Sequence, residues 1–99
     1  MIDIELLKYP IGKFLKPEHI SEQNLKEASA YLRLFPQYLE ETVKEFAEEQ
    51  LNTPYRPGGW TVGEVIHHLS DSHMNALTRF KLALTEDNPT IKPYDEAAW

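Results

Sequence analysis

Three of the four histidines lie close together, in the stretch from Trp60 to Asn75. Imidazole is the side chain in this chain best suited to bind a divalent metal. On a helix with about 100° per residue, His67 and His68 diverge by about 100°, and His68 and His73 diverge by about 140°. These pairs do not share the i, i+4 face that a helical metal clamp requires. The stretch therefore offers one good metal ligand.

Each of these histidines also has an ordinary structural interpretation. On the residues alone, His68 is most simply a partly buried histidine that is hydrogen-bonded to a neighbour. His67 points away from the apolar face of the helix, and His73 lies on that face, where an inter-helix hydrogen bond would satisfy its ring. If His68 binds a metal, Asp71 is a candidate acceptor for its second ring nitrogen, although a surface carboxylate is the commoner role.

A line of polar residues continues from His68 along the same predicted helix, at spacings of four, three and four: Ser72, Asn75 and Arg79. These side chains stack on one flank of the apolar stripe, so they are candidates to line a cofactor-binding pocket, and the alternative is an ordinary polar flank. Arg79 is suited to hold a carboxylate or another anionic group of a thiol cofactor. We assign no catalytic residue, because the chain shows neither a phosphate-binding loop nor a serine nucleophile on a strained turn.

The helix that positions these residues is predicted over 61–85. Thr61 is the candidate N-cap, Glu64 completes a capping box, and Trp60 and Val65 are placed for a hydrophobic staple. Apolar residues then share one broad face at helical spacing: Val62, Val65, Ile66, Leu69, Ala76, Leu77, Phe80 and Leu84.

The sequence as a whole predicts an all-α fold class, in which one partial domain over 1–99 contains two long helices and an irregular N-terminal arm. Proline and glycine interrupt residues 1–20, which we expect to dock on the core through Ile11, Phe14 and Leu15. The first long helix is predicted over 21–51, starting at Ser21 and kinked near Pro36. Residues 52–60 form a loop, and residues 86–99 form a tail.

Composition excludes several classes of protein. A net charge of −6 argues against a nucleic-acid partner, which normally requires a basic patch. Zero cysteines exclude a disulfide framework and thiolate ligands. The sequence has no apolar run of about 18 residues and no secretory signal, so we expect a cytoplasmic protein without a membrane partner.

Several segments together resemble the YfiT branch of the DinB superfamily. They are Tyr9 to Gly12, Gln50 to Val62, His67 to Asn75, Arg79 to Glu86 and Ile91 to Glu96. The resemblance implies an up-down four-helix bundle in which three histidines hold a divalent metal, commonly zinc or nickel. It further implies a metal-dependent hydrolase, or a transferase that moves bacillithiol or another low-molecular-weight thiol. The family ligand directly before a leucine corresponds to His68.

The resemblance also implies that two further histidine ligands come from a His-x-x-x-His pair on a last helix, which these 99 residues do not contain. We therefore expect this chain to form the amino-terminal half of the bundle and to be inactive as a lone chain. Whether it is part of an enzyme stays open. Either the carboxy-terminal half or a second copy would complete it. In the second case the chain is a non-catalytic dimerisation module that forms an intermolecular four-helix bundle. An active form would act on a small molecule or a low-molecular-weight thiol.

Overall fold

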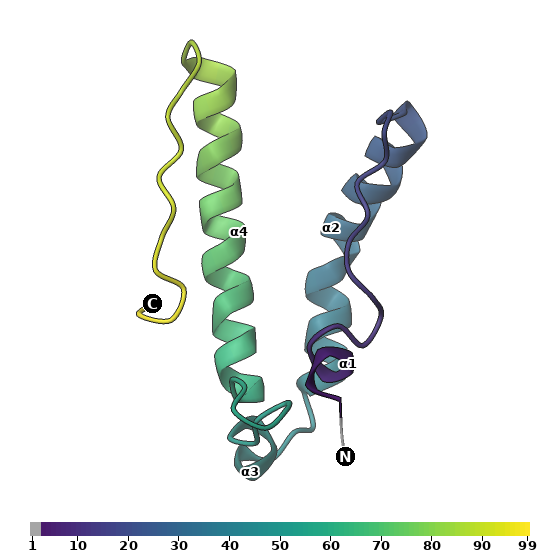
Figure 1. The fold of residues 1–99 in the computed structure, drawn as a ribbon, viewed down its shortest axis with the longest axis vertical. Helices are drawn as coiled ribbons and strands as arrows, with labels where there is room; N and C mark the ends of the chain where they lie inside the picture. The colour runs from purple at the N-terminus through teal and green to yellow at the C-terminus, as the bar shows by residue number, and fades with distance from the viewer. Residues whose placement is uncertain (1–2) are drawn as a thin grey trace. The chain divides into compact units, whose positions relative to one another are not determined.

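The computed structural model describes residues 3–99, and the regular structure in this range is helical apart from an isolated β-bridge. The elements are α1 (Ile4–Lys8), α2 (Glu22–Val43), α3 (Glu48–Leu51) and α4 (Val62–Thr85), shown in Figure 1. The predicted all-α fold class is confirmed. The chain divides into two compact units, Met1–Gln50 and Leu51–Trp99.

Helix α4 begins with the capping box that the sequence predicts. The Thr61 side chain accepts a hydrogen bond from the Glu64 backbone N–H at 3.1 Å. The Glu64 carboxylate in turn accepts one from the Thr61 backbone N–H at 3.0 Å. Two N–H groups that have no partner within the helix are thereby satisfied, which fixes the start of α4.

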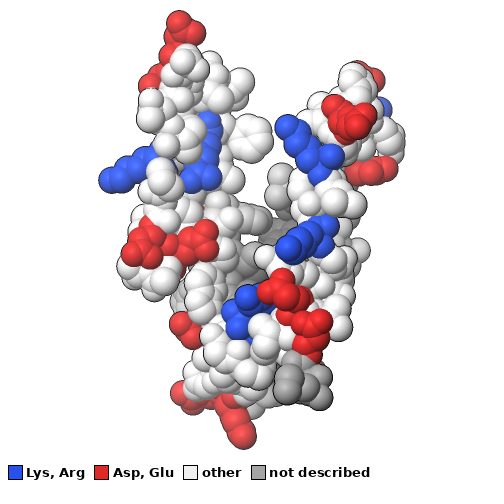
Figure 2. Space-filling view, in the orientation of Figure 1, with Lys and Arg blue, Asp and Glu red and all other residues white. Residues whose placement is uncertain are grey.

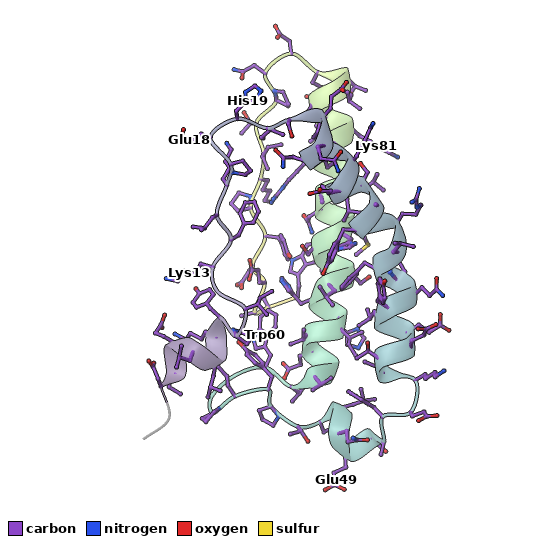
Figure 3. The ribbon with its side chains drawn as sticks, turned by 90° about the vertical axis from the view of Figure 1, so that its right-hand side faces the viewer. Lys13, Glu18, His19, Glu49, Trp60 and Lys81 are labelled. Carbon is purple, nitrogen blue, oxygen red and sulfur yellow. The ribbon has the colours of Figure 1, made fainter. Side chains whose placement is uncertain are left out.

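The loop before α4 is tied to the start of that helix. Pro54 and Thr61 form an antiparallel bridge, and Tyr55 N–H donates to Trp60 O at 3.0 Å. A tight turn closes the loop, with Gly59 N–H bonded to Arg56 O at 3.0 Å. Gly58 has φ +71° there, a left-handed conformation that glycine adopts without steric strain. This loop holds Trp60 directly before the first turn of α4 (Figure 3).

The tail over 86–99 leaves α4 at its C-terminal end and runs back beside the helix (Figure 1). It ends in a turn, in which the backbone N–H groups of Ala98 and Trp99 both donate to Asp95 O, at 3.2 and 3.1 Å. The return of the tail brings its aromatic residues back to the N-terminal half of α4.

Helix α2 starts as predicted and ends earlier. Ser21 is its N-cap, in a capping box with Asn24, and Pro36 lies inside the helix. The predicted continuation to residue 51 is wrong, because the chain leaves α2 after Val43 and resumes in α3. The Gln50 side chain accepts the Ala47 N–H at 2.8 Å, so this N–H is used to start a new helix. A kink at Pro36 stays a prediction.

The N-terminal arm differs from the expected irregular segment. It contains the short helix α1, which forms because the first proline comes only after this helix has ended. The side chain of its N-cap, Asp3, accepts a hydrogen bond from the Glu5 N–H at 2.9 Å. Ile11, Phe14 and Leu15 are exposed by 98, 87 and 86%, so docking of the arm through these side chains is not seen.

None of residues 3–99 is buried. Large apolar side chains on both long helices remain exposed, among them Leu25, Leu32, Leu77, Phe80 and Leu84. The predicted apolar stripes are therefore present, and within the described residues neither unit buries its own stripe. None of the helices over residues 3–99 has the length and hydropathy needed to cross a membrane.

Candidate functional site

The imidazole of His68 is half-buried against two aromatic side chains from different segments. Trp60 meets it edge-on, with ring centroids 4.9 Å apart and planes at 71°. Tyr94 of the tail stacks on it, with centroids 6.5 Å apart and planes at 25°. Trp60, placed by the loop, and Tyr94, placed by the returning tail, thus restrict the orientation of this ring.

A cavity of about 270 Å³ opens beside His68, and we call it the histidine cavity. His67 lines it together with His68, although His67 is exposed, as its predicted position off the apolar stripe requires. Carboxylates of Glu64, Asp71 and Glu96 contribute to the same wall. The site therefore combines imidazole and carboxylate groups, which are metal-binding types.

The donor groups do not form a complete metal site within residues 3–99. No set of three histidine, aspartate or glutamate side chains in this range is arranged to hold a metal ion. His68 can supply one imidazole, and a structural or catalytic zinc site needs at least three protein ligands. The described residues can thus supply some of the ligands of a metal site, but not a complete set. The predicted role of Asp71 as acceptor for His68 stays a prediction.

The polar line predicted from His68 to Arg79 is divided between two cavities. Asn75 and Arg79 line a second cavity of about 410 Å³, which we call the tail cavity because residues of the tail, including Lys92 and Tyr94, form much of its wall. Ser72 is half-buried but lines neither of these two cavities. His73 is exposed on α4 and also lies outside both.

Sequence reasoning missed the tail residues that complete both cavities. Tyr94 contacts His68, and Trp99 lines the histidine cavity as well as the tail cavity. Residues 86–99 have no periodic pattern that could have related them to α4. The signal that could have pointed to them is the resemblance, which extends over Ile91 to Glu96.

Comparison with known proteins identifies the family. Residues 31–99 match the family model of the DinB superfamily. The chain belongs to the DinB superfamily. The part that matches includes α4, the loop before it and the tail, so both cavities lie inside the DinB-like region.

Curated relatives in this family are bacterial proteins. The chain is 50% identical over 93 residues to "Putative metal-dependent hydrolase YfiT" of Bacillus subtilis, covering 94% of this chain and 52% of that protein. It is 48% identical over 99 residues to "Putative metal-dependent hydrolase" of Geobacillus thermodenitrificans, covering 100% of this chain and 56% of that protein. The chain thus spans about half the length of these relatives.

A solved structure supports the same assignment. YfiT from Bacillus subtilis, which has an unusual four-helix bundle topology, matches with a TM-score of 0.90 and 50% sequence identity. The match covers 95% of this chain and 54% of YfiT. The all-α DinB chain therefore corresponds to about half of a four-helix bundle.

Proposed function

We propose that this DinB chain supplies one metal ligand, His68, to the site of a metal-dependent hydrolase or thiol S-transferase. The observation that carries the proposal is the position of His68, a half-buried imidazole held by Trp60 and Tyr94 beside a cavity lined with carboxylates. The names of two relatives about 50% identical to this chain support the proposal, because both are named as metal-dependent hydrolases. The metal we propose is zinc or nickel, and the substrate is a small molecule or a low-molecular-weight thiol.

The remaining ligands must come from outside residues 3–99, because this range does not bring three suitable side chains together. Either the other half of a DinB bundle or a second copy of this chain would provide them. We therefore propose that the chain by itself is inactive, and we assign no catalytic step to its residues. Their contribution is to hold the imidazole in a fixed orientation and to shield it with aromatic rings.

Metal titration of the full chain tests this proposal. Zinc or nickel is added while the ring resonances of the histidines are followed by NMR, in wild type, in His68→Ala and in His19→Ala. His19 lies outside α4 and lines neither of the two cavities, so His19→Ala removes an imidazole without touching the site. We expect His68 to respond first and metal binding to weaken in His68→Ala alone. Equal affinity in all three proteins would contradict the proposal.

A second function, a self-associating helical module, is favoured by a different observation. None of residues 3–99 is buried, and Leu77, Phe80 and Leu84 on α4 are exposed by 57, 66 and 84%. A chain of this size without a buried core cannot readily offset the conformational entropy lost on folding. We propose that a second copy of the chain covers these side chains and builds a four-helix bundle between two molecules. The oligomeric state in solution is the direct test.

A further inference from the structure

The tail cavity has the size and composition of a small-molecule site. Its volume of about 410 Å³ lies within the range of about 300–1,000 Å³ that is usual for ligand pockets. It lies between α4, which contributes Asn75 and Arg79, and the tail, which contributes Lys92 and Tyr94. The wall is therefore formed by two segments that are adjacent in the fold and separate in the sequence.

Positive charge is in excess in this cavity. Arg79 and Lys92 both line it, and within residues 3–99 neither side chain has a hydrogen-bond or ion-pair partner. Asp95 is the acidic residue of the lining, and one of its carboxylate oxygens already accepts the Ala98 N–H at 3.2 Å. Two unpaired cations beside one engaged carboxylate stand out in a chain of net charge −6. Figure 2 shows Lys and Arg atoms on the part of the molecule formed by α4 and the tail.

Aromatic rings form the other part of the wall. The rings of Tyr94 and Trp99 lie 4.8 Å apart at 55° and both line the cavity, together with Ile91 and Leu82. Such a surface accepts the flat or apolar body of a ligand, whereas the two cations accept its charged end. A bidentate guanidinium contact favours a carboxylate over a neutral polar group.

We propose that the tail cavity binds a small carboxylic acid, with its carboxylate at Arg79 and Lys92 and its apolar part against Tyr94 and Trp99. This inference deepens the proposed function, because it gives the substrate class and because Tyr94 also contacts His68. Binding of the acid requires only the side chains of the tail cavity and no metal. The two proposals can therefore fail separately.

The test uses the full chain and benzene-1,2-dicarboxylate (phthalate) as the probe, with the uncharged diamide phthalamide as its isosteric control. Binding is followed by NMR at low ionic strength without added metal. We expect saturable binding of phthalate, with the largest shift changes at Arg79, Lys92, Tyr94 and Trp99, and no saturable binding of phthalamide. Raising the ionic strength should weaken the binding of phthalate, because the two cations are exposed. Equal binding of the two probes would overturn the proposal.

Charge-matched variants locate the site. Arg79→Gln and Lys92→Gln should each weaken phthalate binding about two- to fivefold, the range expected for exposed ion pairs. Arg33→Gln on α2 and Lys81→Gln on α4 (Figure 3) remove the same charges from positions outside the cavity lining and should leave the affinity unchanged. Equal weakening in all four variants would show a general charge effect and overturn the proposal. Phthalate binding is measured without metal, so it is read separately from the metal titration: an unchanged metal affinity in His68→Ala would contradict only the proposed metal site, and normal phthalate binding by Arg79→Gln and Lys92→Gln would contradict only the proposed acid site.

Discussion

The ring of Tyr94 stacks on the imidazole of His68, with centroids 6.5 Å apart and planes inclined by 25°. His68 belongs to α4 and Tyr94 to the tail, so this contact joins the end of the described chain to the candidate metal ligand. Trp60 contacts the same imidazole at 4.9 Å. The orientation of the ligand thus depends on the loop before α4 and on the tail after it.

Tyr94→Ala should change the environment of His68, because the stacked ring is removed. We expect the carbon-bound ring protons of His68 to shift in NMR spectra, since they lose the ring-current effect of Tyr94. Tyr94→Phe keeps an aromatic ring at the same place and should leave these protons near their wild-type positions. Identical His68 resonances in wild type and Tyr94→Ala would contradict the observed stacking.

Thr61→Ala should weaken the start of α4, because it removes the side-chain acceptor of the Glu64 N–H. Loss of such an N-cap lowers the free energy of unfolding by about 1 kcal/mol. Thermal unfolding followed by circular dichroism measures the change, and hydrogen exchange at the Glu64 amide localises it.

Thr42→Ala is the matched control for the cap. Thr42 lies inside α2, where its hydroxyl donates to Tyr38 O at 2.6 Å. Alanine has the higher helix propensity, so this variant should be neutral or slightly more stable. An equal loss of stability in the two variants would argue against a specific capping role for Thr61.

Phe80→Gln should weaken self-association, because Phe80 is exposed by 66% on the apolar stripe of α4. Burying a phenylalanine contributes about 1.5–3 kcal/mol, so its removal should raise the dimer dissociation constant by about tenfold or more. Sedimentation equilibrium over a range of concentrations measures this constant. Lys81→Gln, at the neighbouring position, should leave it unchanged. A folded wild type that stays monomeric at all concentrations would exclude the dimer.

The two long helices could be predicted because their signals are local. Ser21 and Thr61 each begin a capping box within four residues of sequence, and the apolar spacing follows directly. The break after Val43 could not be predicted in the same way, since apolar residues continue at helical spacing through Phe46 and Ala47. It depends on the competing cap that Gln50 provides for Ala47.

The candidate site could be predicted only in part for a related reason. His68 and Arg79 stand out by residue type and spacing on one helix, so sequence periodicity finds them. Tyr94, Lys92 and Trp99 reach the site through the return of the tail, and a contact between distant segments leaves no periodic pattern in the sequence. The division of the polar line into two cavities likewise follows from where the tail lies.

Trp99 forms part of the wall of both cavities. The Trp99 indole therefore limits the volume of the histidine cavity and of the tail cavity, so a smaller residue at this position would enlarge both. A substitution of Trp99 that makes room for a larger ligand in one cavity would also enlarge the other. Each cavity can be changed by itself only through a residue that lines that cavity alone, such as Lys92 in the tail cavity or Glu96 in the histidine cavity.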